Sequence, residues 1–230
     1  MNTREIEILD DISFNLKPEQ VITRMRLRHS NPQIEAIVRE LLEQVLPVAH
    51  PKAVYIASWV DNKDSFSVDI EGARFTSRVL SKNLTMFKRV FPYVATCGCE
   101  LEEIRISSQD MLKTYCLDVI KMLALGTAIA RLSETVTKKY TLGQTSHMNP
   151  GSLADWPLPE QQKLFPLFGD VEKLIGVRLS TSSMMYPLKS SSGIFFTSDT
   201  RFESCQLCPR ENCPGRRATY STEMLEKYLG

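Results

Sequence analysis

The sequence predicts a single α+β domain with a mainly antiparallel sheet flanked by helices. The chain has 230 residues, of which 43% are apolar, so it is long enough to bury a substantial core. Segments with the 3.6-residue period of amphipathic helices interleave with short apolar segments typical of strands. They do not follow the regular strand–helix–strand period that accompanies a parallel sheet, and this favours the antiparallel arrangement.

The helices are predicted from periodicity and from their start and stop residues. Residues 30–45 begin with a sequence typical of a helix start, Ser30-Asn31-Pro32-Gln33, and Pro47 follows them. Residues 110–138 form the longest predicted helix. Four small residues between positions 124 and 130 would let another element pack very close to this helix. Shorter helices are expected at residues 17–27, 83–90 and 160–168.

The predicted strands are short and irregularly spaced. Residues 65–70 alternate apolar and polar side chains, so we expect them to form a hairpin with residues 53–60 across the polar turn 61–64. Further strands are expected within residues 6–14 and at residues 93–96, 140–144, 177–181 and 194–197.

Three portions of different character follow one another along the chain. Residues 1–139 form an N-terminal α/β portion, residues 140–203 contain two long polar loops, and residues 204–230 are rich in cysteine. No low-complexity linker separates them, so we expect one compact domain.

Composition and charge exclude several classes of function. The net charge is +1, with charges evenly scattered, which argues against nucleic acid as the main partner. No run of eighteen apolar residues is present to span a membrane, and the first residues lack the apolar core of a signal peptide. Six cysteines in such a chain are typical of thiols or metal ligands, and we expect a cytoplasmic protein.

The most informative stretch is residues 147–196. Two segments rich in Pro, Gly and Ser, residues 147–159 and 179–196, flank a short helical piece. Loops held on a scaffold are where binding groups concentrate, so these two loops are able to close around a small polar ligand. The alternative interpretation is a pair of ordinary surface loops.

Short motifs recur in a fixed order within this stretch. They are Pro150-Gly151, Trp156-Pro157, Asp170-Val171-Glu172-Lys173, Gly176, Leu179-Ser180-Thr181-Ser182, Met185-Tyr186-Pro187, Ser190-Ser191-Ser192-Gly193 and Phe195-Phe196. Their order and spacing resemble the reactivation domain of cobalamin-dependent methionine synthase. The resemblance is weak over the first 140 residues and has no counterpart from Cys205 onward.

This resemblance implies both a fold and a role. In the family, the cobalt of bound cobalamin is occasionally oxidised to inactive cob(II)alamin. The domain holds S-adenosylmethionine over the corrin while an electron arrives, and methyl transfer regenerates methylcobalamin. This chain has no Asp-x-His-x-x-Gly cobalamin motif. The implied partners are therefore a separate corrinoid protein or cobalamin-dependent methyltransferase, which supplies the cobalamin, and an electron donor.

The resemblance also assigns ligand-binding residues. The family motif Arg-x-Ala-Pro-Gly-Tyr corresponds here to His147, Asn149, Pro150, Gly151 and Ser152. An arginine would bind the methionine carboxylate through two parallel hydrogen bonds, whereas a histidine binds it singly and well only when protonated. We therefore expect weak S-adenosylmethionine binding that His147→Arg improves.

Further candidates come from the second loop and its neighbours. Phe202 falls near a family tyrosine, and Ser190, Ser192 and Gly193 belong to the serine-rich motif. Lys189 is a candidate partner for a carboxylate or corrinoid phosphate, or else a solvated lysine. Trp156 is a candidate cover for a ring system, or else simple packing. We expect the surface around Trp156, Lys189 and residues 190–192 to face the corrin.

A second signal is the cysteine cluster Cys205, Cys208 and Cys213, which lies in a region rich in Pro and Gly. Thiolates at this spacing can converge on a metal ion. Cys97 and Cys99 are the candidate sources of a fourth ligand. Zinc would make a structural clasp, whereas an iron–sulfur cluster would relay the electron that the inferred chemistry needs, and this argument favours iron–sulfur. The alternative is a metal-free redox-sensitive loop.

Three functions remain open from the sequence. The first is a stand-alone activator of a corrinoid protein such as methionine synthase. The second is a corrinoid-docking or electron-transfer module that does not use S-adenosylmethionine. The third is a zinc-clasped regulatory or nucleic-acid protein that borrows the fold, which the near-neutral charge disfavours. Cys116 is expected to be an ordinary core residue.

Overall fold

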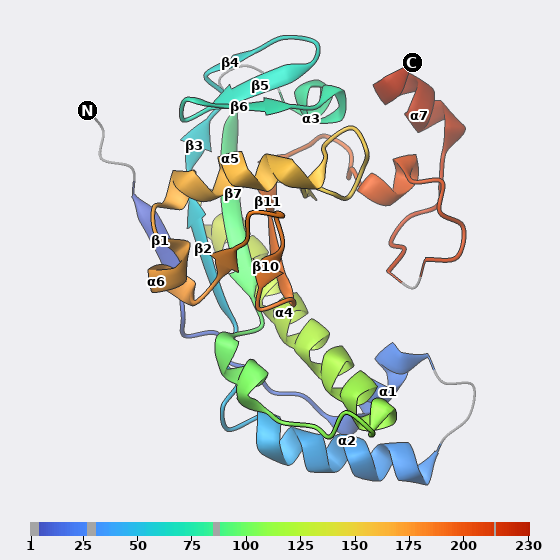
Figure 1. Ribbon diagram of the computed structural model, residues 1–230. Coiled ribbons are helices and arrows are strands. Elements are labelled where there is room, and N and C mark those ends of the chain that lie inside the picture. Colours follow the sequence, from blue (N-terminus) through green and yellow to red (C-terminus); the bar gives the residue numbers. More distant parts are fainter. Residues whose placement is uncertain (1–4, 27–30, 85–87, 214) are drawn as a thin grey trace.

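The computed structural model describes residues 5–26, 31–84, 88–213 and 215–230, and its centre is a large antiparallel sheet (Figure 1). The strand order is β1-β2-β7-β11-β8, and β3 pairs with one end of β7. The strands are β1 (Ile6–Leu9), β2 (Lys52–Ile56), β3 (Ser58–Trp59), β7 (Arg89–Thr96), β8 (Thr145–Met148) and β11 (Ser190–Thr197). Every pairing is antiparallel, so the predicted α+β class is confirmed.

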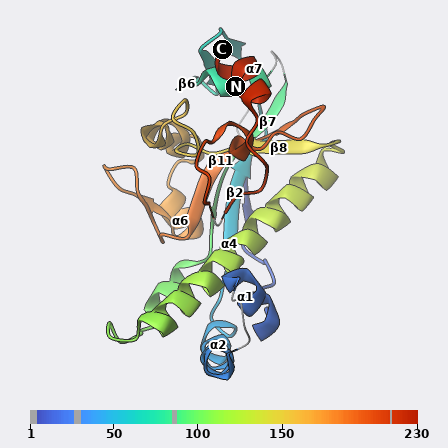
Figure 2. The same ribbon diagram turned by 90° about the vertical axis from the view of Figure 1, so that its right-hand side faces the viewer.

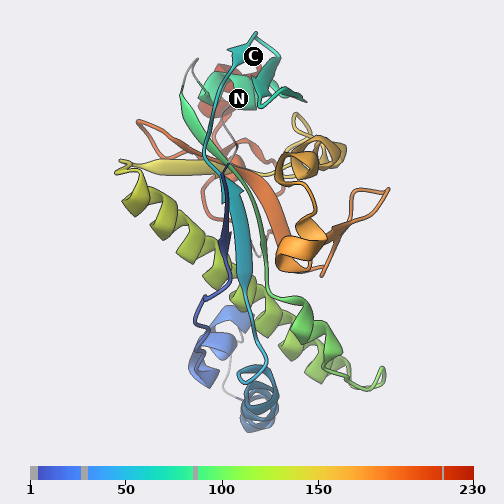
Figure 3. The ribbon, with the colours of Figure 1, turned by 90° about the vertical axis from the view of Figure 1, so that its left-hand side faces the viewer.

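Both faces of the sheet are buried, because successive side chains of a strand point to opposite faces. On β11, Ile194 and Phe196 belong to one core cluster and Phe195 belongs to another. Helix α4 (Met111–Lys139) covers the Phe195 face, while the short helices α5 (Gln161–Leu164) and α6 (Val171–Ile175) lie on the opposite side (Figures 2 and 3).

Helix α4 packs against the sheet with one half and against two other helices with the other half. Asp110 caps its start by accepting a hydrogen bond of 2.9 Å from the amide of Lys113. Its C-terminal half packs Leu132 and Val136 on the sheet, and its N-terminal half packs on α1 (Pro18–Met25) and α2 (Pro32–Val45). Cys116 is fully buried there, which confirms its prediction as a core residue.

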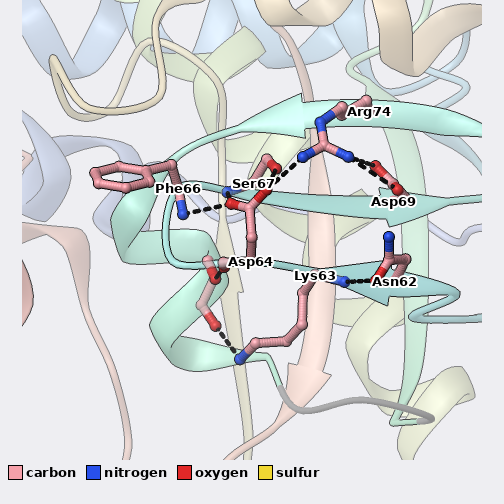
Figure 4. A network of polar contacts seen from close by, with 8 residues as sticks. Asn62, Lys63, Asp64, Phe66, Ser67, Asp69 and Arg74 are labelled. Atoms are coloured by element: carbon pink, nitrogen blue, oxygen red, sulfur yellow. Dashed lines mark hydrogen bonds and ion pairs between the residues drawn. The ribbon is translucent and has the colours of Figure 1, made fainter.

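A small second sheet consists of β4 (Asn62–Lys63), β5 (Ser67–Ile70) and β6 (Ala73–Thr76). The carboxylate of Asp64 closes its first turn by accepting from the amides of Phe66 and Ser67 at 2.7 and 2.9 Å, and Arg74 bridges Asp64 and Asp69 (Figure 4). The predicted hairpin is therefore wrong in its partner: β5 pairs with β4 and β6, whereas residues 52–59 belong to the large sheet.

The C-terminal residues return to the main core. After the 3-10 turn η4 (Ser204–Leu207), helix α7 (Thr222–Leu229) packs beside α3 (Arg78–Asn83). The hydroxyl of Tyr228 donates to Asn83 Oδ1 at 3.0 Å, and its ring lies 5.2 Å from that of Phe202. The cysteine-rich segment is thus joined at both ends to the same core as the large sheet.

Several predicted element boundaries differ from the structure. The predicted helix 83–90 covers the end of α3 and the start of β7, and residues 85–87 lie outside the described residues. The predicted strand 140–144 is a turn after α4, in which Thr141 has a positive φ of 51°. The predicted strand 177–181 is confined to β9 (Arg178–Leu179), which pairs with β10 (Met185–Tyr186).

The serine-rich motif is the largest correction, because residues 190–193 are part of β11 and not of a loop. Elsewhere the predicted helices at 30–45 and 110–138 are confirmed as α2 and α4, although α2 is capped by Asn31 and Ser30 lies outside the described residues. Residues 158–168 form successive 3-10 and α turns. None of the helices in the described parts of the chain combines the length and apolar character of a membrane span.

Candidate functional site

Two adjoining pockets lie between α4 and residues 201–213 and 215–217. The first, which we call the His147 pocket, has a volume of about 510 Å³, and the second, the cysteine pocket, about 550 Å³. They share Gly126, Ile129 and Arg217. The remaining residues of the His147 pocket are Ala130, Ser133, Gln144, Thr145, Ser146, His147, Phe195, Arg201, Phe202 and Glu203.

Small residues of α4 make room for both pockets. No atom of another part of the described chain lies within 4 Å of the position that a Cβ of Gly126 would take. Ala124 and Ala128 of the same helix, by contrast, are fully buried. The small residues noticed in the sequence therefore have two roles, since some allow close packing and Gly126 leaves open space.

Strands β8 and β11 provide the aromatic wall of the His147 pocket. His147 and Phe195 are paired across the two strands, with ring centroids 5.0 Å apart. Phe202 also lines this pocket and is largely buried, and its amide donates to the hydroxyl of Ser146 at 2.8 Å. The wall is therefore fixed by sheet pairing and by one cross-connection to the C-terminal segment.

The charged groups of this pocket surround Glu203, which is only 7% exposed. Its Oε1 accepts from Arg201 Nε and Nη2 at 3.0 and 2.8 Å, and its Oε2 accepts from Arg217 Nε at 3.0 Å. Arg217 Nη1 lies 3.3 Å from His147 Nε2. Two guanidinium groups thus meet one carboxylate, which leaves this end of the pocket with an excess of one positive charge.

His147 is a neutral imidazole in this setting. Burial, together with the nearby guanidinium groups of Arg217 and Arg201, lowers the pKa of His147 to about 4. A neutral imidazole protonated at Nδ1 accepts at Nε2, and this is the tautomer that suits the approach of the Arg217 N–H group. The positive charge at this place therefore belongs to Arg217, and ligand binding by His147 stays a prediction.

The turn after β8 contributes less to the pockets than predicted. Asn149 Nδ2 donates to the Tyr93 hydroxyl at 2.6 Å and to the Ser192 carbonyl at 2.7 Å, so it holds three strands together. Gly151 has a φ of +84° and donates its amide to the Trp156 carbonyl at 2.7 Å, and Pro150 is buried. Only the two ends of the predicted set, His147 and Ser152, line the pockets.

Trp156 is a core residue and not a surface residue. It is fully buried and stacks edge-on against Phe75 with ring centroids 6.1 Å apart. Its neighbour Asp155 accepts from the amides of Arg78 and Val79 at 3.2 and 2.9 Å, which anchors the turn to α3. Of the two interpretations of Trp156, the packing one is correct, and this ring is not available to cover a corrin or adenine.

The serine-rich residues lie in strand β11 and line neither pocket. The hydroxyl of Ser192 is buried and donates to Gln161 Oε1 at 2.7 Å, and that of Ser190 lies 3.0 Å from Thr96 Oγ1. Gly193 lies against the Met148 carbonyl, with no room for a Cβ. Lys189 Nζ forms an ion pair of 2.8 Å with Asp118 of α4. The serine-rich end of the second predicted loop therefore belongs to the sheet, whereas closure of the two loops on one ligand stays a prediction.

The three clustered cysteines do lie together. Cys205, Cys208 and Cys213 all line the cysteine pocket, and the described residues that line it include no carboxylate. Four arginines line the same pocket: Arg24, Arg210, Arg216 and Arg217. This pocket is therefore cationic, with an apolar floor where it meets Met122, Leu125 and Ile129.

The cysteine loop is organised around a guanidinium group. Arg216 Nη1 donates to the carbonyl oxygens of Cys205 and Ala218, both at 3.1 Å, and Arg216 Nη2 donates to that of Cys208 at 3.2 Å. The next amide, of Arg217, donates to Cys205 Sγ at 3.5 Å. The loop thus obtains its shape from backbone carbonyls that converge on Arg216.

The predicted metal centre is not formed in the described parts of the chain, where no three His, Cys, Asp or Glu side chains are arranged to hold a metal ion. Cys97 and Cys99 lie elsewhere, at the end of β7 and in the 3-10 turn η1 (Cys99–Glu103). Burial raises the pKa of the Cys97 thiol to about 12, so it stays protonated. The iron–sulfur and zinc expectations are accordingly not supported.

Sequence reasoning missed Arg201, Glu203 and Arg217, which carry the charge of the His147 pocket. Arg217 and His147 are 70 positions apart, so no local pattern relates them. The signal that was present is the run of small residues on α4, which includes Gly126.

No family model and no curated protein matches the sequence at a significant level. The fold is similar to the crystal structure of the MetH reactivation domain bound to AdoHcy, with a TM-score of 0.61 and 13% sequence identity. The similarity covers 86% of this chain and 80% of that one. At this identity, the similarity shows a shared fold.

Proposed function

We propose that this protein supports the reductive reactivation of a separate corrinoid protein, such as a cobalamin-dependent methionine synthase, by presenting S-adenosylmethionine to its cobalt. The observation that carries the proposal is the fold similarity to a reactivation domain that binds AdoHcy, over most of both chains. The ordered motifs between residues 147 and 196 support the same relationship.

The His147 pocket suits a ligand of this class. Small-molecule sites of several hundred Å³ combine apolar walls with a few polar groups that fix the ligand's orientation. Here Phe195, Phe202 and Ile129 provide the apolar part, and Glu203 and Arg217 provide a charged end. S-adenosylhomocysteine, the demethylated form of S-adenosylmethionine, likewise joins an aromatic base to a charged amino-acid group.

The proposed reaction needs little chemistry from this chain. An external one-electron donor reduces the partner's cob(II)alamin to cob(I)alamin. The cobalt(I) electron pair then attacks the sulfonium methyl group, the S–CH₃ bond breaks, and the products are methylcobalamin and S-adenosylhomocysteine. The role of this protein is to hold the methyl donor in place, because positioning alone accounts for a large part of such a rate enhancement.

The test is to mix this protein with a cob(II)alamin-loaded corrinoid protein, a reductant and S-adenosylmethionine, and to follow the visible spectrum of the corrin. We expect the bands of methylcobalamin to appear only when all components are present. A matched reaction without S-adenosylmethionine serves as the control. No methylcobalamin with any corrinoid partner from the same cell would contradict the proposal.

A second candidate is a docking or electron-transfer module that does not use S-adenosylmethionine. It is favoured by one observation: the position of the family arginine holds His147, whose pKa is low enough to keep it uncharged. In the same experiment this candidate predicts a shifted cob(II)alamin spectrum without methylation. The zinc clasp on which a regulatory role would depend is not formed among the described residues.

A further inference from the structure

We infer that Arg217, delivered by the cysteine-rich segment, is the residue that binds the carboxylate of the adenosyl ligand, in place of the arginine that the resemblance expects at position 147. This inference rests on the proposed function, and it gives the cysteine-rich segment a role in ligand recognition.

The guanidinium of Arg217 occupies the right place. It lies on the wall common to both pockets, and its Nη1 is 3.3 Å from His147 Nε2. Strand β8 has His147 where the resemblance expects an arginine. Arg217, 70 positions later in the sequence, provides a guanidinium at the same place. A guanidinium beside the aromatic wall of the pocket is the group best suited to a carboxylate, because it offers two parallel N–H donors.

Arg217 also has donors to spare. Its Nε donates to Glu203 and one Nη1 hydrogen is directed at His147, while Nη2 has no partner among the described residues. Its side chain is 48% exposed, so the unused N–H groups are accessible from the pocket. These are the donors that we assign to the ligand.

The need to neutralise the Glu203 carboxylate does not explain why Arg217 is placed beside it. Arg201 already forms two hydrogen bonds to Glu203 Oε1, at 3.0 and 2.8 Å, so the buried carboxylate has a cation without Arg217. The one hydrogen bond that Arg217 Nε donates to Glu203 Oε2 instead fixes the plane of the second guanidinium. We therefore regard Glu203 as a positioning residue.

The cysteine loop holds Arg217 at this point. Arg216 binds the carbonyls of Cys205 and Cys208, and the amide of Arg217 donates to Cys205 Sγ. These contacts fix the backbone at residues 216 and 217, so the side chain of Arg217 emerges toward α4 and His147. A lysine there would keep the charge but lose the planar pair of donors.

The experiment is calorimetric titration of the whole protein with two probes, S-adenosylhomocysteine and 5′-methylthioadenosine, which has the same nucleoside but no amino-acid end. We expect Arg217→Gln to weaken S-adenosylhomocysteine binding by roughly 10- to 100-fold, the effect of losing hydrogen bonds to a charged group. Binding of 5′-methylthioadenosine should not change. Arg217→Lys should give an intermediate loss, and this variant keeps the charge if Arg217→Gln folds poorly.

Arg210→Gln is the matched control, because Arg210 lies in the same segment and lines only the cysteine pocket. It should bind both probes as the unaltered protein does. Equal losses for both probes in Arg217→Gln, or no loss for either, would overturn the inference and leave the proposed function standing. If the unaltered protein binds neither probe, the use of an adenosyl ligand fails together with the inference.

Discussion

Gly193 of β11 lies so close to Met148 of β8 that a Cβ at position 193 would come within 2.3 Å of the Met148 carbonyl oxygen. The same Cβ would come within 2.6 Å of Asn149 Nδ2. Only glycine therefore permits the pairing that holds His147 beside Phe195. The conformation at Gly193 is ordinary, so its requirement is one of space.

We therefore predict that Gly193→Ala destabilises the protein by about 2 kcal/mol, since overpacking a closed interior typically costs this much. The strands must separate to admit the methyl group, because its neighbours are backbone atoms and a fixed amide. Thermal unfolding followed by circular dichroism measures the effect. A midpoint equal to that of the unaltered protein would show that β8 can move away freely.

The opposite outcome is expected at Gly126, in the middle of α4. Its Cβ position is open, and alanine has a higher helix propensity than glycine by about 1 kcal/mol, so Gly126→Ala should raise the unfolding temperature.

Gly126→Phe should fill the space between the two pockets and abolish S-adenosylhomocysteine binding, with the fold retained. Tight binding to Gly126→Phe would place the ligand elsewhere.

A third prediction concerns acid stability. In the folded state the pKa of His147 is about 4, against an ordinary value of 6.5. The unfolded chain therefore takes up a proton between these pH values that the folded protein does not, and stability falls as the pH falls from about 6.5 to about 4. The upper limit of this loss is about 3 to 4 kcal/mol, because the two pKa values differ by about 2.5 and one pKa unit corresponds to about 1.4 kcal/mol.

His147→Gln is the control for this titration, since its amide oxygen can accept from Arg217 but does not titrate in this range. Urea unfolding of both proteins at several pH values gives the difference in slope. The same dependence in both proteins would assign the acid sensitivity to other groups. Glu7 is one such group, because hydrogen bonds from Lys139, Tyr55 and Tyr140 outweigh burial and lower its pKa.

The fourth prediction reverses the expectation that His147→Arg strengthens ligand binding. The structure already holds the guanidinium of Arg217 at 3.3 Å from this ring, in a partly buried place with an excess of positive charge. A second guanidinium would repel it and displace it from Glu203. We expect weaker S-adenosylhomocysteine binding in a calorimetric titration, and an affinity above that of the unaltered protein would restore the earlier interpretation.

Local signals in the sequence were sufficient for the long helices. Asn31, Asp110 and the apolar periodicity of α2 and α4 are properties of neighbouring residues, and the structure has both helices where they were predicted. Residues 190–193 were misassigned because three serines and a glycine resemble a loop. Their hydroxyl groups and backbone find partners on β7, in Asn149 and in Gln161, and these contacts are remote in sequence.

The cysteine loop shows a different limit of sequence reasoning. The spacing of Cys205, Cys208 and Cys213 is compatible with a metal-centred loop and equally with one centred on an arginine. What distinguishes the two is whether main-chain carbonyl oxygens bind an arginine. Every residue has such an oxygen, so the sequence does not reveal which ones do. The charged group of the His147 pocket was missed for a related reason, since Arg201, Glu203 and Arg217 meet only after the segment has folded.

Because Arg216 holds this loop through main-chain oxygen atoms, most of its architecture does not depend on sulfur, apart from the contact of Cys205 Sγ with the Arg217 amide. Alkylation or oxidation of Cys208 and Cys213 should consequently leave the scaffold that carries Arg217 intact. Such changes would alter the lining of the cysteine pocket, whereas the aromatic wall on the other side of Ile129 would keep its form. Recognition of the ligand and the redox chemistry of the thiols would then be separable properties of one short stretch of chain.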